Sequence, residues 1–297
     1  MSRRVQHFGG GHTELKLDVV TGYLAAYARA LKDKGFRLSY LDAFAGSGWR
    51  AVGSATDGQG SLLPEPEAAA GSAIRVLRNA ERLNRYVFGD ANEGNIASLK
   101  AAIAEARSID PSLPEPEIHC CDANDLVARE CARLRRSSMD RTVMFLDPFG
   151  MQVQWATLEQ IAATQKVDLW LLVPTGQALI RLLARNGNIS SGWERALSDF
   201  LGGADWRDRF YAQPSQDLFG TLRQERQATL QDVSRFVIER LKATFGPGTH
   251  PTGLSLAHGG SGAEAYLLAF ACANPNPAAY NLALKFANHM IRHPRGV

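Results

Sequence analysis

The segment "DAFAGSG" places an aspartate, a phenylalanine and two glycines directly after an apolar run that has the character of a β-strand. The residues with chemical interest are Asp42, Phe44, Gly46 and Gly48. In an open α/β sheet, the turn after the first strand commonly holds an adenosine-containing ligand, because glycine lets the backbone approach that ligand closely. We therefore expect a ligand site at this turn, and a buried turn without a ligand is the alternative.

Two classes of ligand compete for such a turn. Gly46, Gly48 and Ala51 satisfy the dinucleotide pattern GxGxxA, but the third position of that pattern should lie in a helix that begins at the turn. Here the following residues are rich in helix breakers, namely Gly53, Gly58, Gly60, Pro64 and Pro66. No helix N-terminus is then placed to hold a pyrophosphate, so a nicotinamide oxidoreductase is the weakest of the function hypotheses.

S-adenosylmethionine carries no phosphate, and "DAFAGSG" resembles the FxGxG motif of S-adenosylmethionine-dependent methyltransferases that act on amino groups of bases. The resemblance implies a role for each residue of the turn. Asp42 would fix the turn and the side of the methionine ammonium, and Phe44 would flank the ligand. Gly46 and Gly48 would admit it.

Two further aspartates end predicted strands. Asp90, in "YVFGDAN", ends the second strand, where a carboxylate can accept hydrogen bonds from both ribose hydroxyls. Asp122, in "HCCDAND", ends the third strand, where the family places an acid or an amide against the adenine amino group. Helix capping is the alternative role for Asp122.

The fourth strand ends in "FLDPFG", which resembles motif IV of amino-methyltransferases, (D/N/S)PP(Y/F/W). By that resemblance, Asp147 and the carbonyl of Pro148 would accept hydrogen bonds from an NH2 group, and Phe149 would stack on the base. This chain has Phe149 in place of the second proline and Gly150 in place of the aromatic residue. The alternative is a capped strand end with Phe149 in the core.

Short motifs spread along the chain resemble the three-Cys-motif partner protein family, TcmP. The matching segments are "HTELK", "YLDAFAGSG", "GSAIRVL", "FLDPFGMQVQW" and "DFLGGADW". The resemblance extends from about residue 11 to about residue 290 and implies a methyltransferase-like fold. It also implies a partner, a radical-S-adenosylmethionine-type protein with three clustered cysteines.

The motif "HTELK" has its own consequence. His12 and Lys16 are four residues apart, so a helix beginning at Thr13 would bring them near one another. No residue of "DAFAGSG" obviously neutralises the carboxylate of S-adenosylmethionine, and an ammonium group suits that task. We predict that Lys16 reaches this carboxylate and that His12 lines the same mouth, whereas a solvated lysine on a capped helix is the alternative.

The elements that must position these residues alternate between strand and helix periods, which predicts an α/β fold with helices on both faces of a largely parallel sheet. Predicted strands include 36–44, 85–90, 118–122, 142–148 and 167–174, and predicted helices include 13–34, 72–82, 95–106, 222–245 and 278–292. The segment 49–70 is rich in glycine and proline and is expected to hold no regular element. "TGLSLAH" and "EAYLLAFACA", joined by "GGSG", predict an antiparallel pair.

With the resemblance, the expected fold is Rossmann-like, of methyltransferase class I. Its sheet would be mostly parallel and seven-stranded, with an antiparallel last strand and a helical insertion before the final strand pair. The expected divisions are an N-terminal helical segment, 1–36, a core that binds S-adenosylmethionine, 37–174, an inserted helical subdomain, 175–248, and a C-terminal strand pair with a helix, 249–297. The insertion would recognise the substrate or a partner.

Composition limits the remaining possibilities. A net charge of +3 permits a nucleic-acid partner without arguing for one. The densest basic run, 132–141, is either a solvated helix end or a phosphate contact. The 297 residues include no segment with the length of a membrane span, so a cytoplasmic protein without a membrane partner is expected. The four cysteines show no CxxC spacing, so they are expected to be reduced packing residues, and no metal site is predicted.

Two function hypotheses of different classes follow. The first is an S-adenosylmethionine-dependent methyltransferase that acts on an amino group, with a nucleic acid as the expected substrate. The second is a non-catalytic S-adenosylmethionine-binding partner or adaptor of the three-Cys-motif protein.

Overall fold

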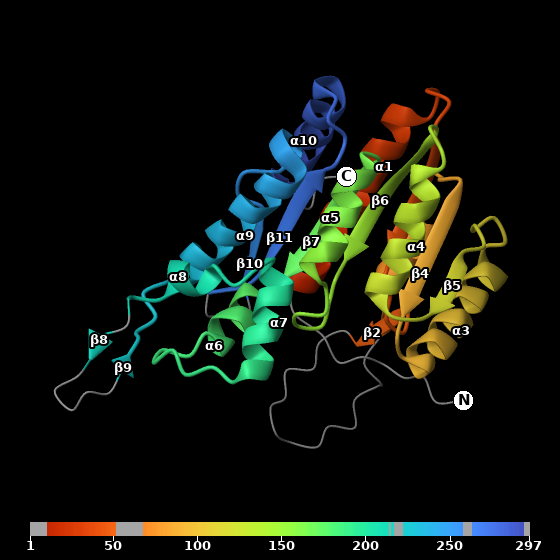
Figure 1. The fold of residues 1–297 in the computed structure, drawn as a ribbon. Coiled ribbons are helices and arrows are strands. Elements are labelled where there is room, and N and C mark those ends of the chain that lie inside the picture. The colour runs from red at the N-terminus through yellow and green to blue at the C-terminus, as the bar shows by residue number, and fades with distance from the viewer. Residues whose placement is uncertain (1–10, 52–67, 214, 217–221, 258–262, 294–297) are drawn as a thin grey trace, which may run out of the picture. The chain divides into compact units, whose positions relative to one another are not determined.

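The computed structural model describes residues 11–51, 68–213, 215–216, 222–257 and 263–293. It divides into two compact units, unit 1 with Met1–Phe145 and Phe286–Val297, and unit 2 with Leu146–Lys285. The fold is α/β, with a mixed, mostly parallel sheet of seven strands (Figure 1). The strand order is β10 (Leu254–Ala257), β11 (Glu264–Cys272), β7 (Val167–Val173), β6 (Asp140–Leu146), β1 (Arg37–Asp42), β4 (Arg85–Asp90) and β5 (Glu117–Cys120).

In unit 1, β1 lies between β4 and β6, and it is parallel to both. Three contacting helices follow one another along one face, α1 (Gly11–Leu31), α2 (Ser72–Leu77) and α3 (Glu93–Ile109). The crossover from β5 to β6 runs in the opposite direction along the sheet, and right-handed connections therefore place α4 (Ala123–Arg135) on the other face. Figure 1 shows α4 in front of the sheet and α1 behind it.

The strands of unit 1 form where apolar residues run almost without interruption, because a parallel sheet covered on both faces buries both sides of each strand. In β1 and β4, all residues after the first are buried, including Tyr40 and Phe88, whose rings meet edge to face. Gly89 is needed for close packing, because a Cβ atom there would lie 2.3 Å from the Leu126 side chain of α4. The tight contact fixes α4 against the sheet just before the strand end at Asp90.

Two sequence expectations in unit 1 were wrong in detail. The first helix begins at Gly11, so Thr13 is a buried residue inside α1 and not its N-cap. The ends of the glycine-rich segment 49–70 do hold regular structure, since β2 (Trp49–Ala51) pairs antiparallel with β3 (Ala68–Ala70). Backbone pairing needs no apolar periodicity, which explains why the pattern gave no sign of it. Residues 52–67 lie outside the described residues.

In unit 2, β11 is antiparallel to both β7 and β10, so the predicted antiparallel pair is confirmed. The "GGSG" connection lies outside the described residues. The helix α5 (Trp155–Thr164) packs on β7 and α9 (Leu230–Phe245) on β11, and α7 (Ser191–Leu201) packs on α5. The remaining elements are a π-helical turn (Thr175–Leu179), α6 (Ile180–Leu182), α8 (Trp206–Phe210), a 3-10 turn (Gly246–Gly248) and α10 (Pro277–Arg292), which ends in unit 1.

The predicted helix from Leu222 is too long by eight residues. It begins at Leu230, after Thr229 and Asp232 form a reciprocal capping box. Upstream of this cap, β9 (Leu222–Arg223) pairs antiparallel with β8 (Ser215–Gln216), so the segment predicted to be helical begins with a short strand. This cap fixes the start of α9, because the Thr229 and Asp232 side chains accept hydrogen bonds from backbone N–H groups at the helix N-terminus.

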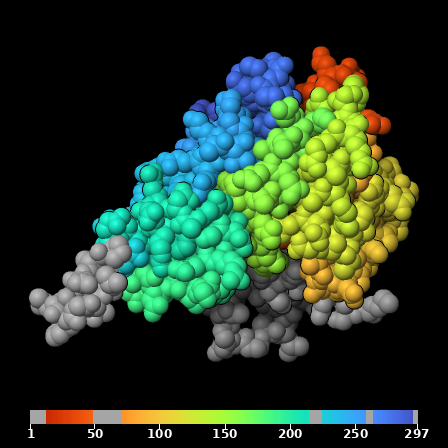
Figure 2. Space-filling model, viewed as in Figure 1, coloured from red at the N-terminus to blue at the C-terminus, as the bar shows by residue number. Residues whose placement is uncertain are grey.

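The helix α4 lies at the surface of unit 1. Figure 2 shows the yellow-green atoms of α4 at the surface that faces the viewer. No helix in the described part of the chain combines the length and the apolar character that crossing a bilayer requires.

The cysteines differ in burial. Cys131 and Cys272 are buried, as packing residues should be. Cys120 is exposed at the end of β5, so the expectation of a packing role was wrong for Cys120. All four thiols are free.

Candidate functional site

The order of the strands in unit 1 marks one position as special. The chain leaves β1 toward β4 on one side and later returns to β6 on the other side, so the strand order reverses between β1 and β6. In open α/β sheets, ligands bind outside the carboxyl ends of the strands at such a switch point. The carboxyl end of β1 is Asp42, which pairs with Phe145 of β6. The predicted turn therefore begins at the switch point.

Asp42 is fully buried, and internal donors occupy both of its carboxylate oxygens. The backbone N–H of Phe44 donates to Oδ1 at 3.0 Å, and the hydroxyl of Ser72 donates to Oδ2 at 2.7 Å. The first bond closes the turn after β1, and the second ties that turn to the start of α2. Contact between Asp42 and a methionine ammonium stays a prediction, whereas its hold on the turn is plain in the geometry.

The two glycines of the turn both adopt left-handed backbone conformations, with φ of +63° at Gly46 and +77° at Gly48. At Gly48 a side chain would also collide with α3, because a Cβ atom would lie 3.0 Å from Leu99 and 3.1 Å from Ala102. The carbonyl of Gly48 accepts a hydrogen bond from the N–H of Gly71 at 2.9 Å. Helix packing and chain direction thus require Gly48, independently of any ligand.

Asp90 connects the glycine turn to the next helix. Its Oδ2 accepts from the N–H of Gly46 at 3.1 Å, and its Oδ1 accepts from the N–H of Asn92 at 2.8 Å. The amide Nδ2 of Asn95 lies 3.1 and 3.2 Å from the two oxygens. Asn92 in turn caps α3 by accepting from the backbone N–H of Asn95 at 3.0 Å. Sequence reasoning missed Asn95, although an Asn three residues after a capping Asn is a recognisable position.

These contacts test whether Asp90 could hold a ribose. A carboxylate has about four lone-pair positions, and the two backbone donors use two of them. The Asn95 amide shares the other two in a bifurcated contact, which is weaker than two separate hydrogen bonds. Ribose hydroxyls would fit Asp90 if the Asn95 side chain turned away. The residues present therefore fit the ligand with one local rearrangement, and the backbone contacts of Asp90 would remain.

The other predicted residues of unit 1 lie at different places. Asp122 is exposed and caps α4 by accepting from the N–H groups of Asn124 at 2.8 Å and Asp125 at 3.3 Å, so the capping alternative is realised. Phe44 is half-buried beside the glycines. Lys16 is half-buried in α1, midway in sequence between Glu14 and Asp18, which both pair with Arg75 of α2. The side chain of His12, which was predicted to line the same mouth, lies outside what the structure describes.

Unit 2 begins with the predicted motif. Pro148 is buried, Asp147 is partly exposed, and Phe149 is 55% exposed, so Phe149 is not a core residue. The N–H of Phe149 donates to the Gln152 side chain at 3.0 Å. Burial raises the pKa of the Tyr266 hydroxyl, and the negative charge of Asp147 raises it further. The motif therefore presents an exposed ring next to a carboxylate whose negative charge raises the pKa of Tyr266.

A second polar group in unit 2 was not predicted. Glu264, at the start of β11, accepts hydrogen bonds at Oε1 from the hydroxyls of Thr175 at 2.7 Å and Ser234 at 2.5 Å. Thr175 begins the π-helical turn directly after β7, so this group joins β11, α9 and the end of β7. A lone glutamate before an apolar run gave no sequence signal. Among the described residues, no group of three or more His, Cys, Asp or Glu side chains could hold a metal ion.

Comparisons with known proteins add little. No protein-family model matches the chain, and no curated protein matches it. Among solved structures, a Legionella pneumophila protein of family DUF519 aligns with 78% of this chain and 93% of its own length, with a TM-score of 0.37 and 13% sequence identity. A likeness at that TM-score carries no argument about the site.

Proposed function

We propose that this protein is an S-adenosylmethionine-dependent methyltransferase that acts on an amino group of a nucleobase. One observation carries the proposal more than any other. At the switch point of the sheet, the turn after β1 has two left-handed glycines, and the carboxylate at the end of β4 holds the N–H of Gly46. This is the position where an α/β sheet binds an adenosine-containing ligand, and the chain continues from the turn into β2 and not directly into a helix, as the dinucleotide pattern would require.

The fold supports the same proposal at a finer level. The mostly parallel sheet with β11 inserted antiparallel agrees with a Rossmann-like, class I methyltransferase architecture. Under this proposal, the residues that hold the cofactor are Lys16, Asp42, Phe44, Gly46, Gly48, Asp90 and Asp122. The cofactor supplies an electrophilic methyl group when it is bound. The chain contributes a fixed turn, whose shape Asp42 and Asp90 maintain through four hydrogen bonds to backbone and hydroxyl donors.

The substrate side of the proposal rests on Asp147, Pro148 and Phe149. An exposed aromatic ring next to a carboxylate suits a flipped base, because the ring can stack on the base while Asp147 accepts a hydrogen bond from its NH2 group. That hydrogen bond would orient the nitrogen lone pair without removing a proton in advance. Membership of the TcmP family, and the three-Cys-motif partner that goes with it, are part of the same proposal.

One observation favours the second candidate, a non-catalytic S-adenosylmethionine-binding partner. Gly150 occupies the aromatic position of motif IV with φ of +69°, a conformation that an aromatic residue rarely adopts. The backbone at position 150 therefore suits glycine and does not suit an aromatic residue. Phe149 would have to supply the stacking ring from the preceding position, and if it does not, the site binds without transfer.

The first experiment asks whether the cofactor binds. Mass spectrometry of the purified protein should detect co-purifying S-adenosylmethionine or S-adenosylhomocysteine, and calorimetry should show binding of S-adenosylmethionine but not of a dinucleotide. A preference for the dinucleotide would overturn the proposal. A radiolabelled-methyl screen over DNA, RNA and the partner protein then separates the two candidates, because binding without transfer to any of them supports the adaptor.

The second experiment asks what Asp147 does. Asp147→Ala should abolish turnover and leave S-adenosylmethionine affinity nearly unchanged, because the contact belongs to the substrate. Glu159→Ala, which removes an exposed carboxylate from α5 of the same unit, is the matched control and should change neither quantity. Equal loss of turnover and affinity in Asp147→Ala would mean that Asp147 is a structural residue.

A further inference from the structure

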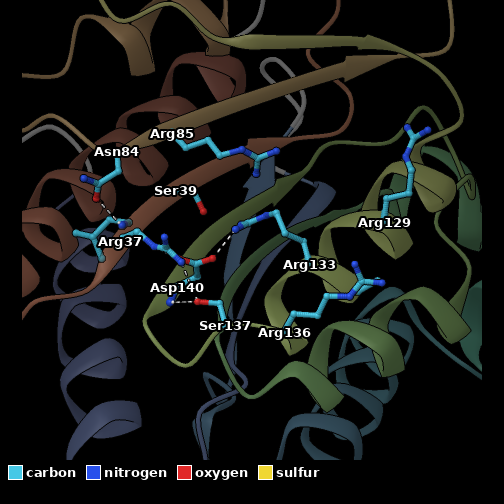
Figure 3. A pocket seen from close by; sticks show the side chains of 11 residues that line it. Arg37, Ser39, Asn84, Arg85, Arg129, Arg133, Arg136, Ser137 and Asp140 are labelled. Atoms are coloured by element: carbon cyan, nitrogen blue, oxygen red, sulfur yellow. Dashed lines mark hydrogen bonds and ion pairs between the residues drawn. The ribbon is translucent and has the colours of Figure 1, made fainter.

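A hollow lies in unit 1 at the end of the strands opposite the glycine turn. It is a cavity of about 640 Å³ at the amino ends of β1, β4 and β6, bounded on one side by α4. Its charged lining consists of Asp140 and the five arginines Arg37, Arg85, Arg129, Arg133 and Arg136 (Figure 3). Volumes of this order are typical of sites for small molecules, and the charge of the lining then determines which kind of ligand could bind.

Most of that charge is neutralised by a continuous chain of ion pairs. Within it, Arg85 contacts Glu117 at 2.7 Å and Glu130 at 2.6 Å. The chain continues from Glu130 to Arg133 at 2.9 Å, from Arg133 to Asp140 at 2.6 Å and from Asp140 to Arg37 at 2.7 Å. It therefore contains three carboxylates and three guanidiniums in strict alternation. We call it the ion-pair chain.

All three carboxylates of the ion-pair chain are ionised near neutral pH. For Glu130 and Asp140, burial opposes ionisation, yet the hydrogen bonds and charges of the neighbouring arginines outweigh it and keep both pKa values below their usual range. The hydrogen bond from Arg85 lowers the pKa of Glu117 as well. The chain is consequently neutral as a whole, and the charges of Arg129 and Arg136 remain in excess.

These two arginines have little to neutralise them. The side chain of Arg136 makes no hydrogen bond or ion pair with any residue that the structure describes, and the Nη2 of Arg129 lies 2.9 Å from the sulfur of Cys121. The buried Nη2 atom of Arg133 also has no hydrogen-bond partner within the described part of the chain. The C-terminal end of α4 carries about half a negative charge, which offsets only part of two full positive charges.

The arrangement on α4 is directional. Arg129, Arg133 and Arg136 are spaced by four and three residues, so they share one face of the helix, and all three line the cavity. Figure 3 shows them along one side of it, with Arg37 and Asp140 on the strand side. Arg135 is exposed on the same helix but does not line the cavity. A solvated helix end explains Arg135, but it does not require three arginines on the helix face that lines the cavity.

We propose that this cavity binds a phosphomonoester of about nucleotide size, with Arg129 and Arg136 as its main charged contacts. A phosphomonoester carries about 1.5 to 2 negative charges near neutral pH, which matches the excess. Guanidinium groups bind phosphate oxygens with two parallel hydrogen bonds, and a hollow of this volume can hold a ligand of nucleotide size. The site is separate from the glycine turn, because the two lie at opposite ends of the same strands.

Calorimetry on the full chain tests the proposal with uridine monophosphate as the probe and uridine as the uncharged control. Neither carries adenine, so the proposed cofactor turn should not capture them, and saturating S-adenosylmethionine should not compete. Arg136→Gln should weaken uridine monophosphate binding by about tenfold, the effect of losing one charge-assisted hydrogen bond. Arg135→Gln, on the same helix but outside the cavity, is the matched control and should leave the affinity unchanged.

Arg136 is exposed and without partners in the described residues, so its substitution should preserve folding, which circular dichroism checks. Three results would overturn the proposal. They are equal affinity for uridine and its monophosphate, equal weakening by Arg135→Gln and Arg136→Gln, and no binding of uridine monophosphate at low salt. A single-stranded RNA oligonucleotide that binds through Arg136 while uridine monophosphate does not would replace the proposed ligand by a nucleic acid.

Discussion

Asp90 offers the sharpest test of the candidate cofactor site, because it has a structural task and a proposed ligand task at once. In Asp90→Ala, the N–H of Gly46 loses its acceptor in a buried position, which costs about 1 to 3 kcal/mol. The N–H of Asn92 lies in a partly buried position near water, so its loss should add about 0.5 to 1.5 kcal/mol. A carboxylate near the start of α3 adds about 0.3 to 1 kcal/mol.

Together these contributions predict that Asp90→Ala lowers the free energy of unfolding by about 2 to 5 kcal/mol, out of the roughly 5 to 15 kcal/mol typical of a domain. Urea denaturation followed by circular dichroism measures the change. Asn95→Ala is the matched comparison, because it removes the bifurcated donor and leaves both backbone bonds of Asp90 in place. A loss below about 1 kcal/mol in Asp90→Ala would refute the structural part of the reasoning.

The same two variants test the ribose contact. If Asp90 accepts from the ribose, Asp90→Ala should lose about 1.5 to 3 kcal/mol of S-adenosylmethionine binding, or about 10-fold to 150-fold in affinity. Asn95→Ala should bind S-adenosylmethionine at least as tightly as the parent chain, since the competing amide is gone. Calorimetry that shows unchanged affinity in Asp90→Ala, or a large loss in Asn95→Ala, would remove the ribose from Asp90.

Further predictions address other parts of the molecule. Because the pKa of Glu130 is lowered on folding from its ordinary value of 4.5, its ion pairs stabilise the protein above that pH, and the midpoint of thermal unfolding should fall as the pH drops below it, less steeply in Glu130→Gln. Iodoacetamide at about pH 8 should alkylate exposed Cys120 but not Cys131, whose pKa burial raises to about 12, and mass spectrometry would expose the reverse order as an error. Gly48→Ala should cost about 2 to 4 kcal/mol through left-handed strain and collision with α3, whereas Gly192→Ala, with nothing within 4 Å of its Cβ position, should not destabilise in the same urea assay. Lys16→Met should weaken S-adenosylmethionine about tenfold in calorimetry while leaving a decarboxylated analogue unaffected, and equal weakening would return Lys16 to a solvent role.

Local patterns in the sequence predicted the local elements well. The strand Arg85–Asp90 has the predicted limits, because its limits coincide with a change from apolar residues to capping residues. The predicted start of the long helix at Leu222 was wrong because residues 223–227 are all good helix formers, whereas the capping box at Thr229 decides where the helix begins. A Thr-x-x-Asp pattern was present in the sequence and could have corrected it.

Asp42 and Asp90 could be located from the sequence because each is the last residue of a strand. Their bonding could not, since a carboxylate at a strand end is equally suited to a ligand, a cap or a neighbouring turn. Asp122 caps a helix, whereas Asp90 holds both a turn and a helix start. The ion-pair chain was beyond sequence reasoning altogether, because Arg37 and Asp140 meet across 103 residues of chain. Only the basic run 132–141 gave any sign of it.

The alternation of charges in the ion-pair chain determines which of its residues should tolerate substitution among related sequences. Loss of the terminal Glu117, which is half exposed, leaves Arg85 paired with Glu130 and places the excess positive charge near water. Loss of the buried, central Glu130 removes one partner from Arg85 and one from Arg133 at once. A second substitution that removes Arg85 should then restore part of the lost stability, because it takes away the excess positive charge. Tolerance should therefore fall from the ends of the chain to its middle, and the middle residues should change in pairs.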